Sequence, residues 1–224
     1  MAKLIFIAGT DTDVGKTYVA ALIAKTLHHS GVNVAVYKPV ASGCRQVGND
    51  LVADDAVQLW EAAGKPGSID DVCPQKFIAP LAPNVAAAKE GKTVDAELLK
   101  LGAQVWTERC EVLIVEGAGG LMSPLAAGVL NINLLKQLEP AGLIIVAANR
   151  LGVIHQTLAT CAAAEKNSVA PSGIILCSPN EDSDDSVRNN ASEIAVYTDV
   201  PVLGQVRFGA SELPFDVSML LNGG

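Results

Sequence analysis

The chain has 224 residues and a formal net charge of −8, and half of its residues are apolar while only 4% are aromatic. This length favours one domain, residues 1–224, and the acidic charge argues against the cationic contacts on which nucleic-acid binding depends. The first apolar run is too short for a signal peptide and no stretch approaches a membrane span, so we expect a soluble, cytoplasmic protein with neither nucleic-acid nor membrane partners.

The first predicted strand, residues 4–8, runs into a polar loop that ends in Gly-Lys-Thr. Apolar residues at helical spacing follow from Lys16 to about Ser30, so the loop stands where a helix begins. Backbone N–H groups and the positive end of the helix dipole face a ligand there. The pattern predicts a phosphate-binding loop in which Lys16 meets the terminal phosphates and Thr17 can ligate Mg²⁺. Its spacing is one residue longer than the common form, and a plain strand–turn–helix connection with a chance lysine is the alternative.

A second buried strand is predicted over residues 32–37, and Lys38 follows it directly, with a loop that reaches Ser42. Ligands of open parallel sheets bind outside the carboxyl ends of the strands. Lys38 and Ser42 would therefore share a cleft with the phosphate loop if the two strands are close. The alternative is a solvated surface lysine.

Asp54 and Asp55 precede a predicted helix over residues 56–63, where a carboxylate can cap the helix or hold a metal. Residues 64–83 contain four prolines, so we expect a long irregular connection of a kind that is usually functional or mobile. An amphipathic helix is predicted over residues 94–110. Its expected apolar face consists of Leu98, Leu101 and Val105, with Trp106 in the core.

The next predicted strand, residues 112–115, ends in Glu116 and a glycine-rich run over residues 117–120. A carboxylate at the end of an apolar strand, facing a phosphate loop, is the arrangement that coordinates Mg²⁺ in many phosphoryl-transfer enzymes. With Lys16 and Thr17 upstream, the sequence favours a metal-binding role for Glu116.

Strands and helices alternate through the rest of the chain, which predicts an α/β fold with a doubly wound, mostly parallel sheet, helices on both faces and a P-loop NTPase-like architecture. The acidic run over residues 181–185 is expected to be a solvated loop, and His28 and His29 to be exposed without a metal role. The five cysteines are scattered without zinc-ligand spacing, so we expect reduced thiols. The remaining predicted strands cover residues 143–147, 173–177 and 200–206. One further helix is predicted to follow residue 155 and end at about residue 167, and two more are predicted over residues 186–197 and 213–221.

Three segments together resemble the dethiobiotin synthetase family, namely residues 9–17, 37–43 and 115–120, with support from residues 123–125 and 151–154. The similarity spans about the first 155 residues in the right order, and the Lys-Pro-Val segment after the second strand is its most specific part. The resemblance implies an ATP- and Mg²⁺-dependent cyclo-ligase of biotin biosynthesis. It would form the ureido ring of dethiobiotin from 7,8-diaminononanoate and CO₂ or bicarbonate, through a carbamate and a carbamic-phosphoric anhydride.

The same resemblance implies roles for individual residues. The implied catalytic residues are Lys38, Lys16 and Thr12, and the implied Mg²⁺ ligands are Thr17, Asp55 and Glu116. The implied nucleotide-binding residues are Asp13, Val14, Gly15, Lys16, Thr17, Tyr18, Asp55, Glu116, Gly117, Ala118, Gly119, Cys177, Arg207 and Phe208. The implied substrate contacts are Lys38, Ser42 and Gly119, with Leu151, Gly152 and Val153 supplied by the other subunit of a homodimer.

The chain departs from the family pattern at three places near the base and the substrate tail. Cys177 stands where an adenine-reading asparagine is common, residues 205–208 replace a proline-containing run, and His155 stands where an asparagine is common.

Two other functions compete with this reading. A switch ATPase would use the same loop, but it commonly has an extra lysine early in the loop, where this chain has Asp11 or Thr12, and a membrane or DNA surface. The ATP-using domain of a cobyrinate-type amide synthase normally continues into a glutaminase domain, and no catalytic Cys/His arrangement follows here.

Overall fold

Six parallel strands form the central sheet in the order β10-β9-β8-β1-β5-β2. The computed structural model describes residues 2–178, 180–181 and 185–222. Apolar runs without alternation build the central strands, because helices bury both faces of a parallel sheet. The strands are β1 (Lys3–Gly9), β2 (Val34–Tyr37), β5 (Val112–Gly120), β8 (Gly142–Ala148), β9 (Gly173–Cys177) and β10 (Val202–Val206).

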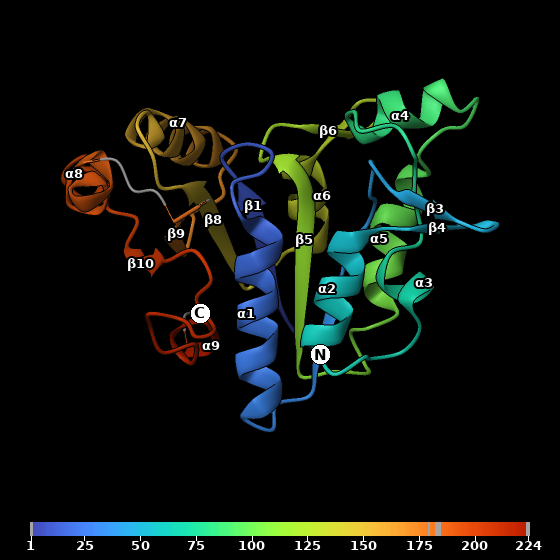
Figure 1. Cartoon of the computed structure of the whole chain (residues 1–224), viewed down its shortest axis with the longest axis horizontal. Coiled ribbons are helices and arrows are strands. Elements are labelled where there is room, and N and C mark those ends of the chain that lie inside the picture. The colour runs from blue at the N-terminus through green and yellow to red at the C-terminus, as the bar shows by residue number, and fades with distance from the viewer. Residues whose placement is uncertain (1, 179, 182–184, 223–224) are drawn as a thin grey trace.

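Helices lie on both faces of this sheet, with α1 and α2 in front and α6 behind β5 (Figure 1). The longest are α1 and α7, of 14 residues each. This architecture confirms the predicted doubly wound α/β fold. The α-helices are α1 (Lys16–His29), α2 (Asp54–Ala62), α3 (Ile69–Val72), α4 (Pro83–Lys89), α5 (Ala96–Gln104), α6 (Asn131–Leu138), α7 (Val153–Lys166), α8 (Asn190–Tyr197) and α9 (Met219–Asn222).

The pairing of β1 with β5 shifts register just below the functional edge of the sheet. Ile7 pairs with Glu116, whereas Gly9 pairs with Gly120, so one residue of β1 faces three residues of β5. A bulge of this kind bends a strand and redirects its side chains. Residues 117–119 therefore leave the plane of the ladder beside the phosphate loop.

Several short elements were not predicted from the sequence. The connections contain two hairpins, β3 (Arg45–Val47) with β4 (Asp50–Val52) and β6 (Pro124–Ala126) with β7 (Val129–Leu130). The proline-rich region over 64–83 is not wholly irregular either, since a capping box at Ser68 starts α3. Helices α4 and α6 were also missed.

The predicted apolar face of α5 is wrong. Leu101 and Val105 are exposed, and the buried positions are Leu99, Gly102 and Ala103. The reason lies in Tyr37 at the end of β2, whose hydroxyl donates to the Leu98 carbonyl at 2.9 Å. A Cβ atom on Gly102 would collide with this hydroxyl, so the helix turns its glycine to the sheet. Trp106 is buried, as expected.

The C-terminal third differs from prediction mainly in helix bounds. A 3₁₀ turn, Asp185–Arg188, precedes α8, and the helix expected over 213–221 is reduced to α9. Residues 182–184 of the acidic run lie outside the described residues. His28 and His29 are exposed and all five cysteines are free thiols, as predicted. Among the residues that the structure describes, none of the helices combines the length and the hydropathy that a membrane crossing requires.

Candidate active site

The loop between β1 and α1 is held from both neighbouring strands of the sheet. The Thr10 N–H donates to the Val146 carbonyl at 2.9 Å, and the Gly9 carbonyl accepts from the Leu121 N–H at 3.0 Å. Two residues of the loop have positive φ, Asp13 at 56° and Gly15 at 91°. Left-handed residues among right-handed ones are typical of the backbone concavities that bind anions. The geometry agrees with the predicted phosphate-binding loop.

Lys16, the first residue of α1, is buried beneath this loop and its ammonium donates to the Asp11 carbonyl at 2.8 Å. Burial lowers the pKa of Lys16, while the Glu116 carboxylate acts in the opposite direction. The Lys16 side chain therefore lies inside the loop, within reach of a phosphate that the loop would hold.

Lys38 is the first residue after β2 and is almost completely buried. Its ammonium donates to a Glu116 carboxylate oxygen and lies 3.2 Å from Asp55 Oδ2. Burial alone would lower the pKa of Lys38, but the carboxylates of Glu116 and Asp55 outweigh it and raise the pKa above the ordinary value. The interpretation of Lys38 as a solvated surface lysine is wrong.

The backbone that carries Lys38 is paired with the proline-rich region. The Lys38 N–H donates to the Val72 carbonyl at 2.8 Å, and the Ala41 N–H to the Gln75 carbonyl at 2.9 Å. The Phe77 N–H donates to the Ala41 carbonyl at 2.9 Å. This pairing fixes the main chain of both segments, and residues 80–83 of the region predicted as a long loop form a wall of the cavity.

Three oxygen-bearing side chains meet at Glu116. The Thr17 hydroxyl donates to Glu116 Oε1 at 2.9 Å, and Asp55 joins through Lys38. Glu116 is completely buried, and its Oε2 atom has no hydrogen-bond partner among the described residues. A buried carboxylate oxygen without a partner is unfavourable unless a ligand satisfies it. Two carboxylates and a hydroxyl are hard oxygen donors of the kind that Mg²⁺ takes, so these residues fit the ion.

Within the described part of the chain, no three His, Cys, Asp or Glu side chains gather as a metal cluster. The donor set at Glu116 is smaller, because it contains only two carboxylates. Such a set suits Mg²⁺, which usually keeps several waters and is shared with substrate phosphates rather than enclosed by protein alone.

Asn131, the first residue of α6, holds the glycine-rich end of β5. Its amide NH₂ group donates to the carbonyls of Ala118 at 2.7 Å and Gly120 at 2.8 Å, and its oxygen accepts from the Ala118 N–H at 3.2 Å. Gly119 has φ of 71°, and a Cβ atom there would stand 2.7 Å from Ser123 Oγ. The bulge is thus a fixed backbone surface beside the phosphate loop.

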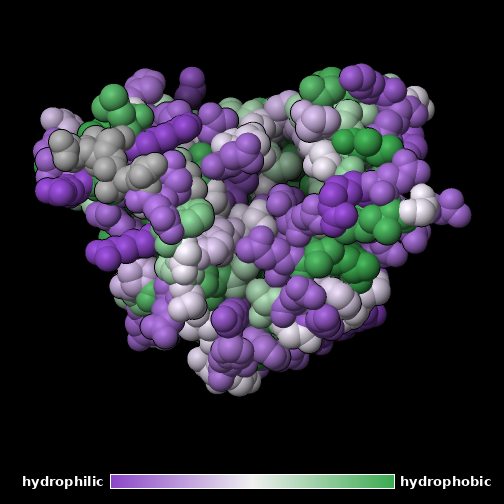
Figure 2. Space-filling model, viewed as in Figure 1, coloured by the Kyte–Doolittle hydropathy of each residue, from purple (hydrophilic) through white to green (hydrophobic). Residues whose placement is uncertain are grey.

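A cavity of about 930 Å³ brings most of the predicted residues together. Figure 2 shows the molecule hollowed at this edge of the sheet, between the part that carries α7 and the part that carries α4. The predicted residues that line the cavity are Thr12, Asp13, Gly15, Lys16, Thr17, Tyr18, Lys38, Ser42, Asp55, Glu116, Ala118, Gly119, Cys177 and Phe208.

Other lining residues were not predicted as site residues. They come mainly from the stretch around Pro80–Pro83 and from the Ser123–Pro124 turn, with Ala41, Gln58, Ser178 and Gly209. The only sequence signal for the first of these stretches was its proline content, which indicated a functional loop without naming a residue.

Six predicted residues are not among those that line this cavity: Val14, Gly117, Leu151, Gly152, Val153 and Arg207. Val14 and Val153 are core residues, and Leu151 is 82% exposed at the start of α7. Gly117 lies on the bulge, where a Cβ atom would collide with Asn131. A role for Leu151 in this chain's own cavity has no support from its position.

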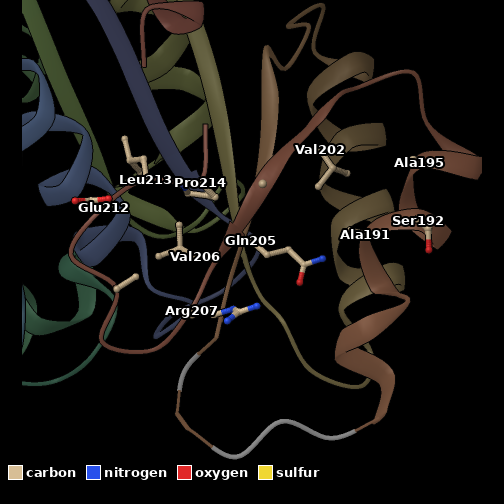
Figure 3. A pocket seen from close by; sticks show the side chains of 12 residues that line it. Ala191, Ser192, Ala195, Val202, Gln205, Val206, Arg207, Glu212, Leu213 and Pro214 are labelled. Carbon is tan, nitrogen blue, oxygen red and sulfur yellow. The ribbon is translucent and has the colours of Figure 1, made fainter. Parts of the chain in front are cut away.

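Arg207 lines a second, more open cavity of about 850 Å³ between β10, α8 and the segment over 210–214. The Gln205 and Arg207 side chains lie on the side of β10 that faces α8 (Figure 3). The Gln205 amide oxygen accepts from Asn149 Nδ2 at 3.2 Å, and Asn190 Nδ2 donates to Asn149 Oδ1 at 2.8 Å. These amides tie the ends of β8 and β10 to α8.

Cys177, the last residue of β9, and Tyr18 of α1 line the first cavity on the side away from β2 and Lys38. Burial raises the pKa of the Cys177 thiol to about 11, so this side chain is a neutral thiol at pH 7. The Tyr18 hydroxyl donates to the Ala210 carbonyl, which connects α1 to the loop that carries Phe208.

Comparisons with known proteins agree with this geometry. A family model described as an AAA domain matches residues 3–210. The ATP-dependent dethiobiotin synthetase BioD of Rhodopirellula baltica is 40% identical over 217 residues, which cover 92% of this chain and 85% of that protein. The protein of the same name from Bacillus cereus is 36% identical over 207 residues, with 92% and 84% covered.

Solved structures show the fold more distantly. FtsY from the chloroplast of Physcomitrella patens matches with a TM-score of 0.56, and the signal recognition particle receptor FtsY from Elizabethkingia anophelis with 0.57, each at 16% identity. The alignment covers all of this chain and 65% of each of theirs. At that identity the likeness shows the fold alone.

Proposed function

Because the chain belongs to the family of ATP-dependent dethiobiotin synthetases, we propose that it closes the ureido ring of dethiobiotin from 7,8-diaminononanoate and CO₂ in biotin biosynthesis. One amine of the substrate captures CO₂ as a carbamate. The carbamate oxygen then attacks the γ-phosphorus of ATP, ADP leaves, and a carbamic-phosphoric anhydride results. The second amine attacks its carbonyl carbon, and phosphate leaves as the ring closes.

The observation that carries this proposal is the placement of Lys38 and Lys16. They follow different strands, yet both line one cavity with Glu116 between them. Phosphoryl transfer asks the protein mainly for positioning and charge stabilisation. Lys16 and the loop N–H groups would hold the terminal phosphates, and Lys38 would hold the carbamate and its developing charge.

Thr17, Asp55 and Glu116 would hold Mg²⁺, which neutralises phosphate charge when bound. Thr12 and Asp13 would line the loop beside the reacting groups, and Ser42 with the backbone of Gly117–Gly119 would contact the diamine. The base would lie toward Cys177 and Phe208, which line the cavity, whereas Arg207 lines the second cavity.

We also propose a cytoplasmic homodimer in which the Leu151–Val153 segment of one subunit reaches the diamine of the other. Support comes from the exposure of Leu151 and from its absence from the cavity of its own chain. Light scattering of the purified protein tests the dimer, and a monomer that retains full activity contradicts it.

The decisive experiment measures phosphate release with ATP, Mg²⁺ and bicarbonate, with and without the diamine. Turnover should require bicarbonate and diamine together, because the carbamate is the nucleophile. Equal release without the diamine would favour a switch ATPase.

A further inference from the structure

Lys38 occupies the position between the two carboxylates that are expected to hold the metal. Its ammonium contacts Glu116 Oε1 and lies 3.2 Å from Asp55 Oδ2. The Thr17 hydroxyl donates to that same Glu116 oxygen. Lys38 therefore contacts two of the three expected metal ligands, Glu116 and Asp55. The third, Thr17, donates to the same Glu116 oxygen that Lys38 contacts.

This lysine also neutralises the buried charge of Glu116. A carboxylate without solvent contact needs a cation or several hydrogen bonds. Within the described residues, Lys38 is the one cation whose ammonium touches Glu116, because Lys16 donates to the Asp11 carbonyl instead. Without a metal, the Lys38 ammonium is thus the positive charge that offsets the cost of burying the Glu116 carboxylate.

A divalent ion that binds Glu116 and Asp55 would lie on the same two carboxylates as this ammonium, with Glu116 Oε2 as an oxygen that Lys38 leaves free. Two cations that share a carboxylate in a poorly solvated site repel each other, and each oxygen lone pair serves one partner at a time. The main chain of Lys38 is fixed by its bond to Val72, so an exchange needs only side-chain rotation. The Lys38 side chain also borders the open cavity, which gives it somewhere to go.

We propose that Lys38 is an internal cation that occupies the metal site of the resting protein and is displaced when Mg²⁺ binds to Glu116 and Asp55. Resting on the function proposed above, the displaced ammonium becomes available to the carbamate only after the metal is in place. Lys38 then has two successive partners, the carboxylates before metal binding and the substrate anion afterwards.

Removal of Lys38 should therefore change the affinity of the site for the metal. A lysine that merely touched substrate would leave metal binding unchanged when removed. A lysine that competes with the metal must instead weaken metal binding, so its removal tightens it. Loss of one charge-assisted hydrogen bond to each carboxylate predicts a gain of about tenfold or more in affinity.

The test is Mn²⁺ binding, measured by the EPR signal of the free ion, in the nucleotide-free protein. Lys38→Met removes the charge and keeps most of the chain length. Lys76→Met is the matched control, since Lys76 is also largely buried and carries the same charge but pairs with Asp70. We expect Lys38→Met to bind Mn²⁺ about tenfold more tightly than the native chain, and Lys76→Met to bind as the native chain does.

Thermal unfolding provides a second measurement, which still tests the proposal if Lys38→Met is less stable than the native chain. In EDTA, Lys38→Met should melt below the native chain, and Lys38→Met/Glu116→Gln should recover part of the loss, because the buried charge is gone. Added Mn²⁺ should raise the melting temperature of Lys38→Met more than that of the native chain.

Equal or weaker Mn²⁺ binding by Lys38→Met overturns the proposal, as does equal tightening by Lys76→Met or no Mn²⁺ binding by any variant. A failure of the proposed function looks different. In that case the predicted order of Mn²⁺ affinities holds, while the native chain releases phosphate without need of the diamine.

Discussion

The Cys177 thiol packs directly against Gly15 of the phosphate loop, so that a Cβ atom on Gly15 would stand 2.5 Å from Cys177 Sγ. The two residues are 162 positions apart in the sequence, and the contact joins the carboxyl end of β9 to the start of α1. The phosphate loop thus packs directly against the strand expected near the base.

Gly15→Ala should weaken nucleotide binding strongly. The new methyl group meets Cys177, and a φ of 91° is strained for any residue with a Cβ atom. Cys177→Ala in the same chain should restore part of the affinity, because it removes the sulfur but not the backbone strain. Calorimetric titration with ADP and Mg²⁺ measures both effects, and full affinity in Gly15→Ala would contradict the packing.

Nucleotide choice should be relaxed. A buried polar contact can reject a wrong base by roughly 10⁴–10⁵, whereas an apolar contact discriminates far less, and a thiol is a weak donor and acceptor. We expect GTP and CTP to be used with losses in kcat/KM on the order of 10² or less against ATP. A preference for ATP above about 10³ at saturating diamine would show that the backbone reads the adenine edge.

Glu116→Gln should raise the Mg²⁺ concentration needed for half-maximal activity. The change keeps the size and the acceptor for Thr17 but removes the charge that a hard cation prefers. Asp54→Asn is the matched control, since Asp54 is exposed and pairs with Arg45. An unchanged Mg²⁺ dependence in Glu116→Gln would remove Glu116 from the metal site.

Lys16→Ala and Lys38→Ala should fail in different ways. Both should lower turnover by roughly 10²–10³, the usual effect of losing one charge-stabilising group. Lys38→Ala should keep its affinity for ADP, whereas Lys16→Ala should lose affinity, because only Lys16 lies inside the phosphate loop. Near-normal turnover by Lys38→Ala would show that the site is wrongly assigned.

Alkaline pH should destabilise the protein partly through Cys161. Burial raises the pKa of this thiol to about 11. The folded state therefore favours the neutral thiol, and the stability that this provides is complete below about pH 9 and lost as pH rises toward about 11.

Between pH 8 and pH 10.5, Cys161→Ser should lose less of its free energy of unfolding than the native chain does, by on the order of 1–2 kcal/mol. Urea unfolding at the two pH values measures the difference, and other alkaline groups cancel in the comparison. Identical losses in both proteins would show that Cys161 does not titrate in this way.

The sequence predicted a shared cleft for Lys38 and the phosphate loop only on the condition that their strands are close, and it did not predict the contact of Lys38 with Glu116. In a parallel sheet the carboxyl ends share one edge, and the register of β2 with β5 pairs Tyr37 with Val115, which makes the next residues neighbours. Rules of strand and helix period placed each residue at a strand end, but the strand order that makes them neighbours came from the structure.

The same rules failed where one distant contact decides the structure. Helix α5 turns Gly102 inward to make room for Tyr37, and no periodic pattern of apolar residues contains that information. Likewise, the Pro80–Pro83 wall faces the cavity because the chain before it is paired with the segment after Lys38. Strands of two or three residues, such as β7, are too short for any period to appear.

The phosphate loop is synthesised well before the strands that hold it in place. Its residues are made before both strands that pair with β1, so β1 has no sheet neighbour until β5 and β8 have been made. The hydrogen bond from the Thr10 N–H to the Val146 carbonyl cannot form until Val146, 136 positions later, has been made. A nascent chain that ends before Val146 therefore carries the whole phosphate-loop motif without the strand contacts that hold the loop, and we expect ATP to assist folding only after β8 has been made.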